Sequence, residues 1–163
     1  IYYHISMKDW NAQRLDFVPD GYVYDGPIAT DEIGVYKDIS GREVLRVACT
    51  YAESFLEGIA VVGHEKGDGR YYSCIDIKGN IIGERQYEDI INCSDGIIVF
   101  KRDDQYGAMD KKGNVLFNST YKCISEFRNG CAIAVNSDGF AGVIDKNGVI
   151  LYEFERGLEL RDE

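Results

Sequence analysis

In four similar segments of this sequence, an aspartate followed by Ile or Lys precedes a glycine by three residues: DISGR (38–42), DIKGN (76–80), DKKGN (110–114) and DKNGV (145–149). Such a carboxylate could ligate a cation, act in catalysis or accept backbone N–H groups within a turn. A calcium loop gathers about six to eight oxygen ligands, whereas each segment offers one Asp, and three of the segments place lysine beside it. The pattern therefore favours a tight hairpin turn closed by glycine, and we expect no metal site.

Other residue types give no stronger indication of chemistry. A nucleophilic serine or cysteine needs a base, and His4 and His64 are the histidines available. The sequence contains no GxSxG elbow. Glycoside hydrolysis uses paired carboxylates, but the adjacent Asp103 and Asp104 would point to opposite faces of a strand. We therefore predict that the chain is not an enzyme and has no catalytic residues, no metal and no cofactor.

Composition limits the partners that the chain can have. The net charge of −10 argues against binding to nucleic acid or to an anionic membrane surface, because both need a basic surface. No apolar run approaches the roughly 18 residues that span a bilayer. The five cysteines lack the CxxC spacing typical of zinc sites. Free thiols in a reducing compartment are the better interpretation, so we expect a cytoplasmic protein.

The aspartate segments mark an internal repeat. Their Asp residues are separated by 38, 34 and 35 residues, and a period of about 20–50 residues indicates a repeat architecture. Three tyrosines and three glycines keep step with them: Tyr51, Tyr87, Tyr121, Gly58, Gly96 and Gly130. We divide the chain into an N-terminal capping or degenerate half-repeat (1–32), four units (33–70, 71–105, 106–139 and 140–152), and an acidic C-terminal tail (153–163).

Each unit has the composition of short strands. Its apolar runs are rich in β-branched and aromatic residues and are bounded by Gly, Asn, Asp and Ser. Sustained apolar spacing of about 3.6 residues, the sign of a helix, is absent. The predicted fold is an all-β tandem array of about four hairpin-containing repeats of about 35 residues, either open or propeller-like.

With these landmarks aligned, the chain resembles the WG-repeat family of bacterial proteins. Its units read as Trp-Gly, Ile-Asp, a Gly-bearing turn, a Tyr, and then Phe-x-x-Gly leading to Ala and Val. The segments YGAMDKKGNVLF and FRNGCAIAV follow that order, and GVIDKNGVIL matches its first half. Other residues replace the family tryptophan, namely Ile33, Tyr72, Tyr106 and Ala141, and Ser73 replaces the glycine in the second unit. The resemblance implies an all-β array used for binding and carries over no catalytic residues.

We therefore expect a protein-binding module that captures another protein through its inter-repeat loops and acidic ends. The specific hypothesis is an acidic immunity or inhibitor protein, because an acidic chain suits electrostatically steered capture of a basic toxin. The alternative is an enzyme or a glycan-binding domain with a pocket lined by carboxylates and tyrosines. The residues expected to contact a partner are Tyr22, Tyr24, Asp68, Asp103, Asp104 and Asp138.

Overall fold

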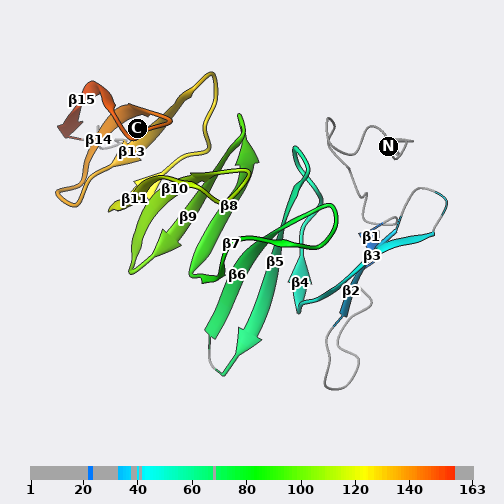
Figure 1. Cartoon of the computed structure of the whole chain (residues 1–163). Coiled ribbons are helices and arrows are strands. Elements are labelled where there is room, and N and C mark those ends of the chain that lie inside the picture. Colours follow the sequence, from blue (N-terminus) through cyan, green and yellow to red (C-terminus); the bar gives the residue numbers. More distant parts are fainter. Residues whose placement is uncertain (1–21, 24–32, 38–39, 41, 68, 157–163) are drawn as a thin grey trace, which may run out of the picture.

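The computed structural model describes residues 22–23, 33–37, 40, 42–67 and 69–156. This part of the chain forms strands and turns and contains no helix, which confirms the predicted all-β repeat array. The strands make four antiparallel sheets, and in each sheet neighbours along the chain are also hydrogen-bonded neighbours. Figure 1 shows the four sheets in a row.

The bounds of the strands are as follows. The first sheet contains β1 (Tyr22–Val23), β2 (Ile33–Lys37) and β3 (Glu43–Ala48). The second contains β4 (Tyr51–Ala52), β5 (Ile59–Lys66), β6 (Gly69–Asp76) and β7 (Ile81–Tyr87). The third contains β8 (Asp89–Ser94), β9 (Ile97–Arg102), β10 (Gln105–Asp110) and β11 (Val115–Tyr121). The fourth contains β12 (Cys123–Ile124), β13 (Cys131–Val135), β14 (Phe140–Asp145) and β15 (Ile150–Arg156).

Successive sheets pack face to face, so the two middle sheets are buried on both faces. Strand β9 shows this arrangement most directly. Ile97 and Val99 pack in a cluster with the fourth sheet, whereas Ile98 and Phe100 pack in a cluster with the second sheet. All four side chains are at most 4% exposed. A strand buried on both faces reads as a continuous apolar run, which explains why IIVF shows no alternation.

Each sequence repeat is shared between two sheets. The unit 71–105 supplies β6 and β7 to the second sheet, and β8 and β9 to the third. The unit 106–139 supplies β10 and β11 to the third sheet, and β12 and β13 to the fourth. Every four-stranded sheet therefore joins the last two strands of one repeat to the first two of the next. Backbone hydrogen bonds thus connect successive repeats.

The Asp-x-x-Gly segments are turns, as the sequence predicts, wherever the structure describes them. The Oδ1 atom of Asp110 accepts backbone N–H bonds of 2.8 and 2.9 Å from the second and fourth residues that follow it. Asp76 and Asp145 make the same two bonds. The first segment, 38–42, lies largely outside the described residues. These carboxylates shape hairpins by accepting hydrogen bonds from the backbone.

A fourth turn of this type occupies a segment that the sequence indicated only as a polar loop. Asn136 begins the sequence NSDGF, which connects β13 to β14. Its Oδ1 atom accepts N–H bonds from Asp138 at 3.1 Å and from Phe140 at 3.0 Å. The side-chain amide oxygen therefore replaces the carboxylate without changing the pattern of bonds.

Two-residue turns precede the second strand of each four-stranded sheet. Glu57, Asp95 and Asn129 have φ angles of 52°, 53° and 51°, and each precedes a glycine whose φ is also positive. Positive φ at both central residues defines the type I′ turn, for which Asn-Gly and Asp-Gly are the usual sequences. The glycines that mark the repeat are the second residues of these turns.

The last strand of each four-stranded sheet contains a β-bulge. In β7 the pairing shifts between Tyr72, which faces Tyr87, and Cys74, which faces Ile82. Strands β11 and β15 show register shifts against their partners as well. These strands are the edges of their sheets, and bulges at edges disturb the regular ladder that another chain could extend.

One landmark of the sequence repeat is wrong in register. Tyr51 begins β4 and is 38% exposed, whereas Tyr87 and Tyr121 end β7 and β11 and are 2% and 7% exposed. Cys49 holds the place of these two buried tyrosines. The backbone shows this, because the N–H that follows each of the three residues bonds to the second strand of the next sheet. The signal was present in the spacing, since Cys49 follows Asp38 by 11 residues, as Tyr87 follows Asp76.

Candidate functional site: a groove, a hairpin edge and an open sheet face

The structure places the predicted acidic contact residues on hairpins at one edge of the array. Asp103 and Asp104 form the turn between β9 and β10, and Asp138 lies in the turn between β13 and β14. Figure 1 shows these two turns along the lower edge of the sheets. Tyr24, Asp68 and the side chain of Tyr22 lie outside the described residues. The predicted contact residues with described side chains are therefore Asp103, Asp104 and Asp138.

These three residues do not form a single cluster. The side chain of Asp104 is 92% exposed, and Lys101 contacts it at 2.8 Å. This lysine lowers the pKa of the Asp104 carboxyl. The Asp104 backbone N–H also bonds to the carboxylate of Glu88 at 3.1 Å. Asp138 lies on a different hairpin. The edge can supply negative charge to a partner but does not assemble a chemical site.

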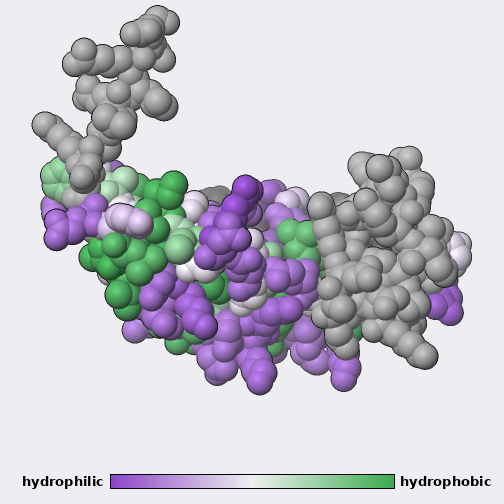
Figure 2. Space-filling model, turned by 90° about the horizontal axis from the view of Figure 1, so that it is seen from above, coloured by the Kyte–Doolittle hydropathy of each residue, from purple (hydrophilic) through white to green (hydrophobic). Residues whose placement is uncertain are grey.

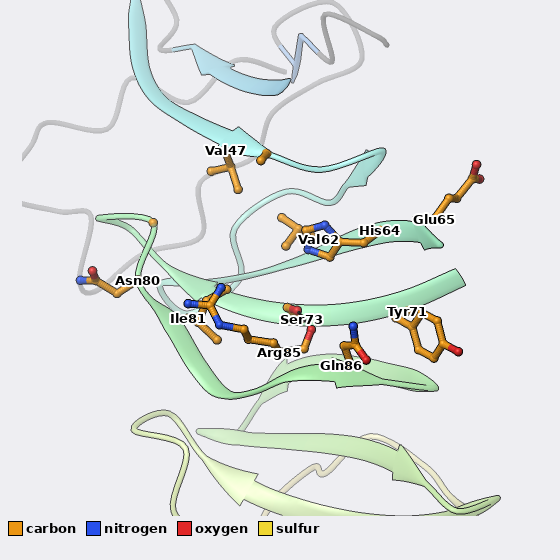
Figure 3. A pocket seen from close by; sticks show the side chains of 12 residues that line it. Val47, Val62, His64, Glu65, Tyr71, Ser73, Asn80, Ile81, Arg85 and Gln86 are labelled. Atoms are coloured by element: carbon orange, nitrogen blue, oxygen red, sulfur yellow. Dashed lines mark hydrogen bonds between the residues drawn. The ribbon is translucent and has the colours of Figure 1, made fainter. Parts of the chain in front are cut away.

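A groove of about 840 Å³ separates the first sheet from the second. We call it the inter-sheet groove, and β3, β5, β6, β7 and the turn between β6 and β7 line it. Figure 3 shows His64, Ser73 and Arg85 on three adjacent strands on one side of the groove, with Val47 of β3 opposite. Val62 and Ile81 add apolar surface. No motif in the sequence indicated this site.

At this interface two smaller side chains occupy the places of aromatic residues that pack together at the next one. Between the second and third sheets, the rings of Tyr87 and Phe100 pack with their centroids 5.1 Å apart. Cys49 stands in the place of Tyr87, and Val62 in the place of Phe100, since each pairs with the equivalent strand of its sheet. Val62 lines the groove, and Cys49 is buried in the same cluster as Val62. A difference between copies, rather than a repeated motif, makes the site.

The second sheet also differs from the third at Ser73. In the third sheet this place is held by Gly107, where an added Cβ would lie 2.7 Å from the carbonyl oxygen of Phe117. Glycine is therefore required there by close approach of the backbone. In the second sheet the Ser73 hydroxyl instead donates a hydrogen bond to the carbonyl oxygen of Arg85. The substitution is accommodated in β7, whose bulge differs from that of β11.

Arg85 has no ion-pair partner among the described residues, whereas four other arginines have one. It is exposed, lines the groove and forms no ion pair with any described residue. Four arginines each pair with a glutamate: Arg46 with Glu43, Arg70 with Glu65, Arg102 with Glu84, and Arg128 with Glu126. The guanidinium of Arg85 is thus available to an anionic group from outside the described chain.

The described lining of the groove contains His64 and Ser73 beside a single carboxylate. Glu65 is the one carboxylate in its described lining, and Arg70 contacts it at 2.8 Å. Burial raises the pKa of Glu53, but this residue bonds to Tyr51 and is not part of the lining. Within the described chain, no group of three or more His, Cys, Asp and Glu residues could hold a metal ion.

The outer face of the fourth sheet is apolar and open. Ile133 on β13 and Tyr152 on β15 are 59% and 70% exposed. Val143 pairs with both of them across β14. In the third sheet, the residue in the place of Ile133 is Val99, which the fourth sheet covers so that 1% remains exposed. Figure 2 shows hydrophobic residues gathered at the end of the molecule that the fourth sheet forms.

A shallow recess of about 350 Å³ lies on this open face. Ser125, Cys131, Ile133 and Val143 are among its lining residues, and the ion pair between Glu126 and Arg128 borders it. We call the surface formed by Cys131, Ile133, Val143 and Tyr152 the open sheet face.

Among the described residues, no helix is long and apolar enough to cross a membrane.

Stacked four-stranded antiparallel sheets, built from units that repeat in sequence, define a tandem β-repeat protein. The family model of the WG-containing repeat matches residues 72–106 and 106–139. These two adjacent units match the family model, which confirms the resemblance seen in the sequence.

Solved structures of two designed proteins are similar to the chain. The computationally designed Ika8 protein has 20% sequence identity and a TM-score of 0.46, and the match covers 79% of this chain and 48% of that chain. The chain therefore spans about half the length of Ika8. For the computationally designed Ika4 protein the identity is 20% and the TM-score 0.45, and the match covers 72% of this chain and 81% of that chain. No curated protein sequence matches the chain.

Proposed function

We propose that the chain is a non-enzymatic protein-binding module that captures another protein. The open sheet face carries this proposal. Ile133 is 59% exposed at a repeat position that is 1% exposed in both preceding sheets, where Val99 and Val61 occupy it. Exposed apolar patches of this kind mark interaction surfaces, because leaving them in water costs about 25 cal/mol per Å².

The acidic hairpin edge suits a basic partner. Asp103, Asp104 and Asp138 are exposed, and the whole chain has a net charge of −10. Such a field accelerates association with a basic protein, and salt weakens the effect. The specific form of the proposal is an acidic immunity or inhibitor protein that acts on a basic target in the cytoplasm.

Affinity purification of the tagged chain from its source cells tests the proposal. We expect a protein in stoichiometric amount with the wild type, and its loss with Ile133→Asp. Val115→Asp is the matched control, because Val115 is an exposed β11 residue outside the open sheet face. The absence of any stoichiometric protein, combined with hydrolase activity abolished by a single carboxylate-to-amide change, would favour the enzyme alternative.

A further inference from the structure

We propose that the inter-sheet groove binds an extended peptide segment of a partner protein, with a glutamate side chain against Arg85 and aliphatic side chains against the apolar wall. The proposal rests on the proposed function in taking the ligand to be part of a protein. It goes further by naming a second site and the chemistry of its ligand. The groove volume of about 840 Å³ lies within the roughly 300–1,000 Å³ of ligand sites.

The charge of the groove indicates an anionic ligand. Arg85 lines the groove without an ion pair to any described residue. Glu65 is already paired with Arg70, so it does not neutralise Arg85. Arginine binds carboxylates through two parallel N–H···O bonds, and such pairs are stronger than neutral hydrogen bonds. An acidic side chain from a ligand would supply the carboxylate that the described residues do not provide.

The next interface shows an arginine–glutamate contact beside an aromatic ring. Between the second and third sheets, Arg102 contacts Glu84 at 2.8 Å, and its guanidinium lies 5.5 Å from the ring centre of Tyr87. In the groove, His64 and Arg46 stand in the places of Arg102 and Glu84. Arg46 contacts Glu43 within the first sheet. A glutamate supplied by a ligand would give Arg85, on β7 of the second sheet, an ion-pair partner beside this interface.

The remaining lining residues indicate what accompanies the carboxylate. Val47, Val62 and Ile81 provide apolar surface on both sides of the groove. In an extended peptide, alternate side chains point to the same side. A glutamate with aliphatic residues two positions away therefore presents both chemistries to the groove at once, whereas a free carboxylate would leave the apolar surface uncovered.

NMR titration of the ¹⁵N-labelled full chain tests this assignment. The probe is the blocked peptide acetyl-Val-Thr-Glu-Thr-Val-amide, and the matched control peptide carries Gln in place of Glu. We expect the glutamate peptide to shift the amide resonances of the groove and to bind roughly three to five times more tightly than the control, the ratio for one solvent-exposed ion pair. Arg85→Gln should abolish this preference. Arg128→Gln, in the fourth sheet, should retain it.

A second variant tests the origin of the groove. Cys49→Tyr introduces the residue that fills the equivalent place at Tyr87 and Tyr121, and it should prevent binding of both peptides. Equal binding of the two peptides, or an unchanged preference in Arg85→Gln, would overturn the assignment. Acetate that shifts the same amides as strongly would overturn the peptide in favour of free carboxylates. Absence of peptide binding would refute the groove proposal and leave the Ile133→Asp test of the open sheet face unaffected.

Discussion

The carboxylate of Asp95 accepts a hydrogen bond of 3.0 Å from the backbone N–H of Gly130, which lies in the equivalent turn of the next sheet. Glu57 makes the corresponding contact to the N–H of Gly96 at 3.3 Å. The first residue of the type I′ turn in the second and third sheets thus binds the second residue of the following turn. Gly96 and Gly130 therefore serve as donors between sheets, in addition to closing their own hairpins.

Asp95→Ala should destabilise the chain more than Asp95→Asn. Alanine removes the acceptor for the Gly130 N–H and is disfavoured at the φ of 53° that Asp95 adopts. Asparagine keeps an acceptor oxygen and tolerates this conformation. We expect a loss of about 1–2 kcal/mol for alanine, and less than about half of that for asparagine. Urea unfolding measures both, and equal losses would show that the contact contributes nothing.

Gly113→Ala should cost more than Gly139→Ala, although both glycines close turns of the same type. Their φ angles are 85° and 86°, so alanine meets the same backbone strain at both, about 1–2 kcal/mol. Only at Gly113 would the new Cβ meet another sheet, 2.5 Å from the backbone nitrogen of Gly83. The difference in unfolding free energy between the two variants isolates this inter-sheet contact. A difference of zero would show that the sheets are not packed this closely in solution.

The turns could be predicted from sequence because their chemistry is local. An Asp whose carboxylate reaches the backbone two and four residues later needs no partner from elsewhere, and the pattern recurs at Asp76, Asp110 and Asp145. The continuous apolar runs are local signals too. The local sequence does not determine which strands share a sheet, because the same order of strands along the chain is compatible with sheets that begin at any strand of the repeat. The structure alone shows that each sheet takes strands from two repeats.

The groove could not be predicted for the same reason. Its volume depends on which side chains meet across two sheets, and Cys49 and Val62 are ordinary apolar residues in the sequence. The misplacement of Tyr51 concealed the difference, because the repeat then seemed to carry a tyrosine in every unit. The 11-residue spacing from Asp38 would have assigned Cys49 to that place. Whether a smaller side chain leaves a cavity depends on how the two sheets pack, and the spacing of residues in the sequence does not show this.

The turn carboxylates should make stability depend on pH. Partial burial raises the pKa of Asp110, but hydrogen bonds from Asn114 and from the backbone of Lys112 outweigh it, so the pKa of the folded state is lowered. The stabilisation from ionised Asp110 is therefore complete above the unfolded pKa of about 3.9 and is lost as pH falls through the lower folded value. Asp110→Asn should keep the turn, as Asn136 does naturally. Its stability deficit relative to wild type should shrink between pH 7 and pH 3, measured by urea unfolding. A deficit independent of pH would contradict the lowered pKa.

The cysteines should react with thiol reagents in an order set by burial. Burial, and then the nearby carboxylate of Glu57, raise the pKa of Cys93 to about 12, and burial also raises the pKa of Cys74. Because the thiolate is the reactive form, both should stay unmodified at pH 8 in the folded chain. Cys123 is exposed and should react first. Cys49 is buried in the apolar cluster between the first and second sheets, together with Tyr36 and Phe55, and should be protected. Mass spectrometry after a short iodoacetamide pulse identifies the labelled residues, and Cys123→Ser controls for the first reaction. Labelling of Cys49 as fast as Cys123 would show that the first and second sheets separate in solution, and would remove the structural basis of the groove.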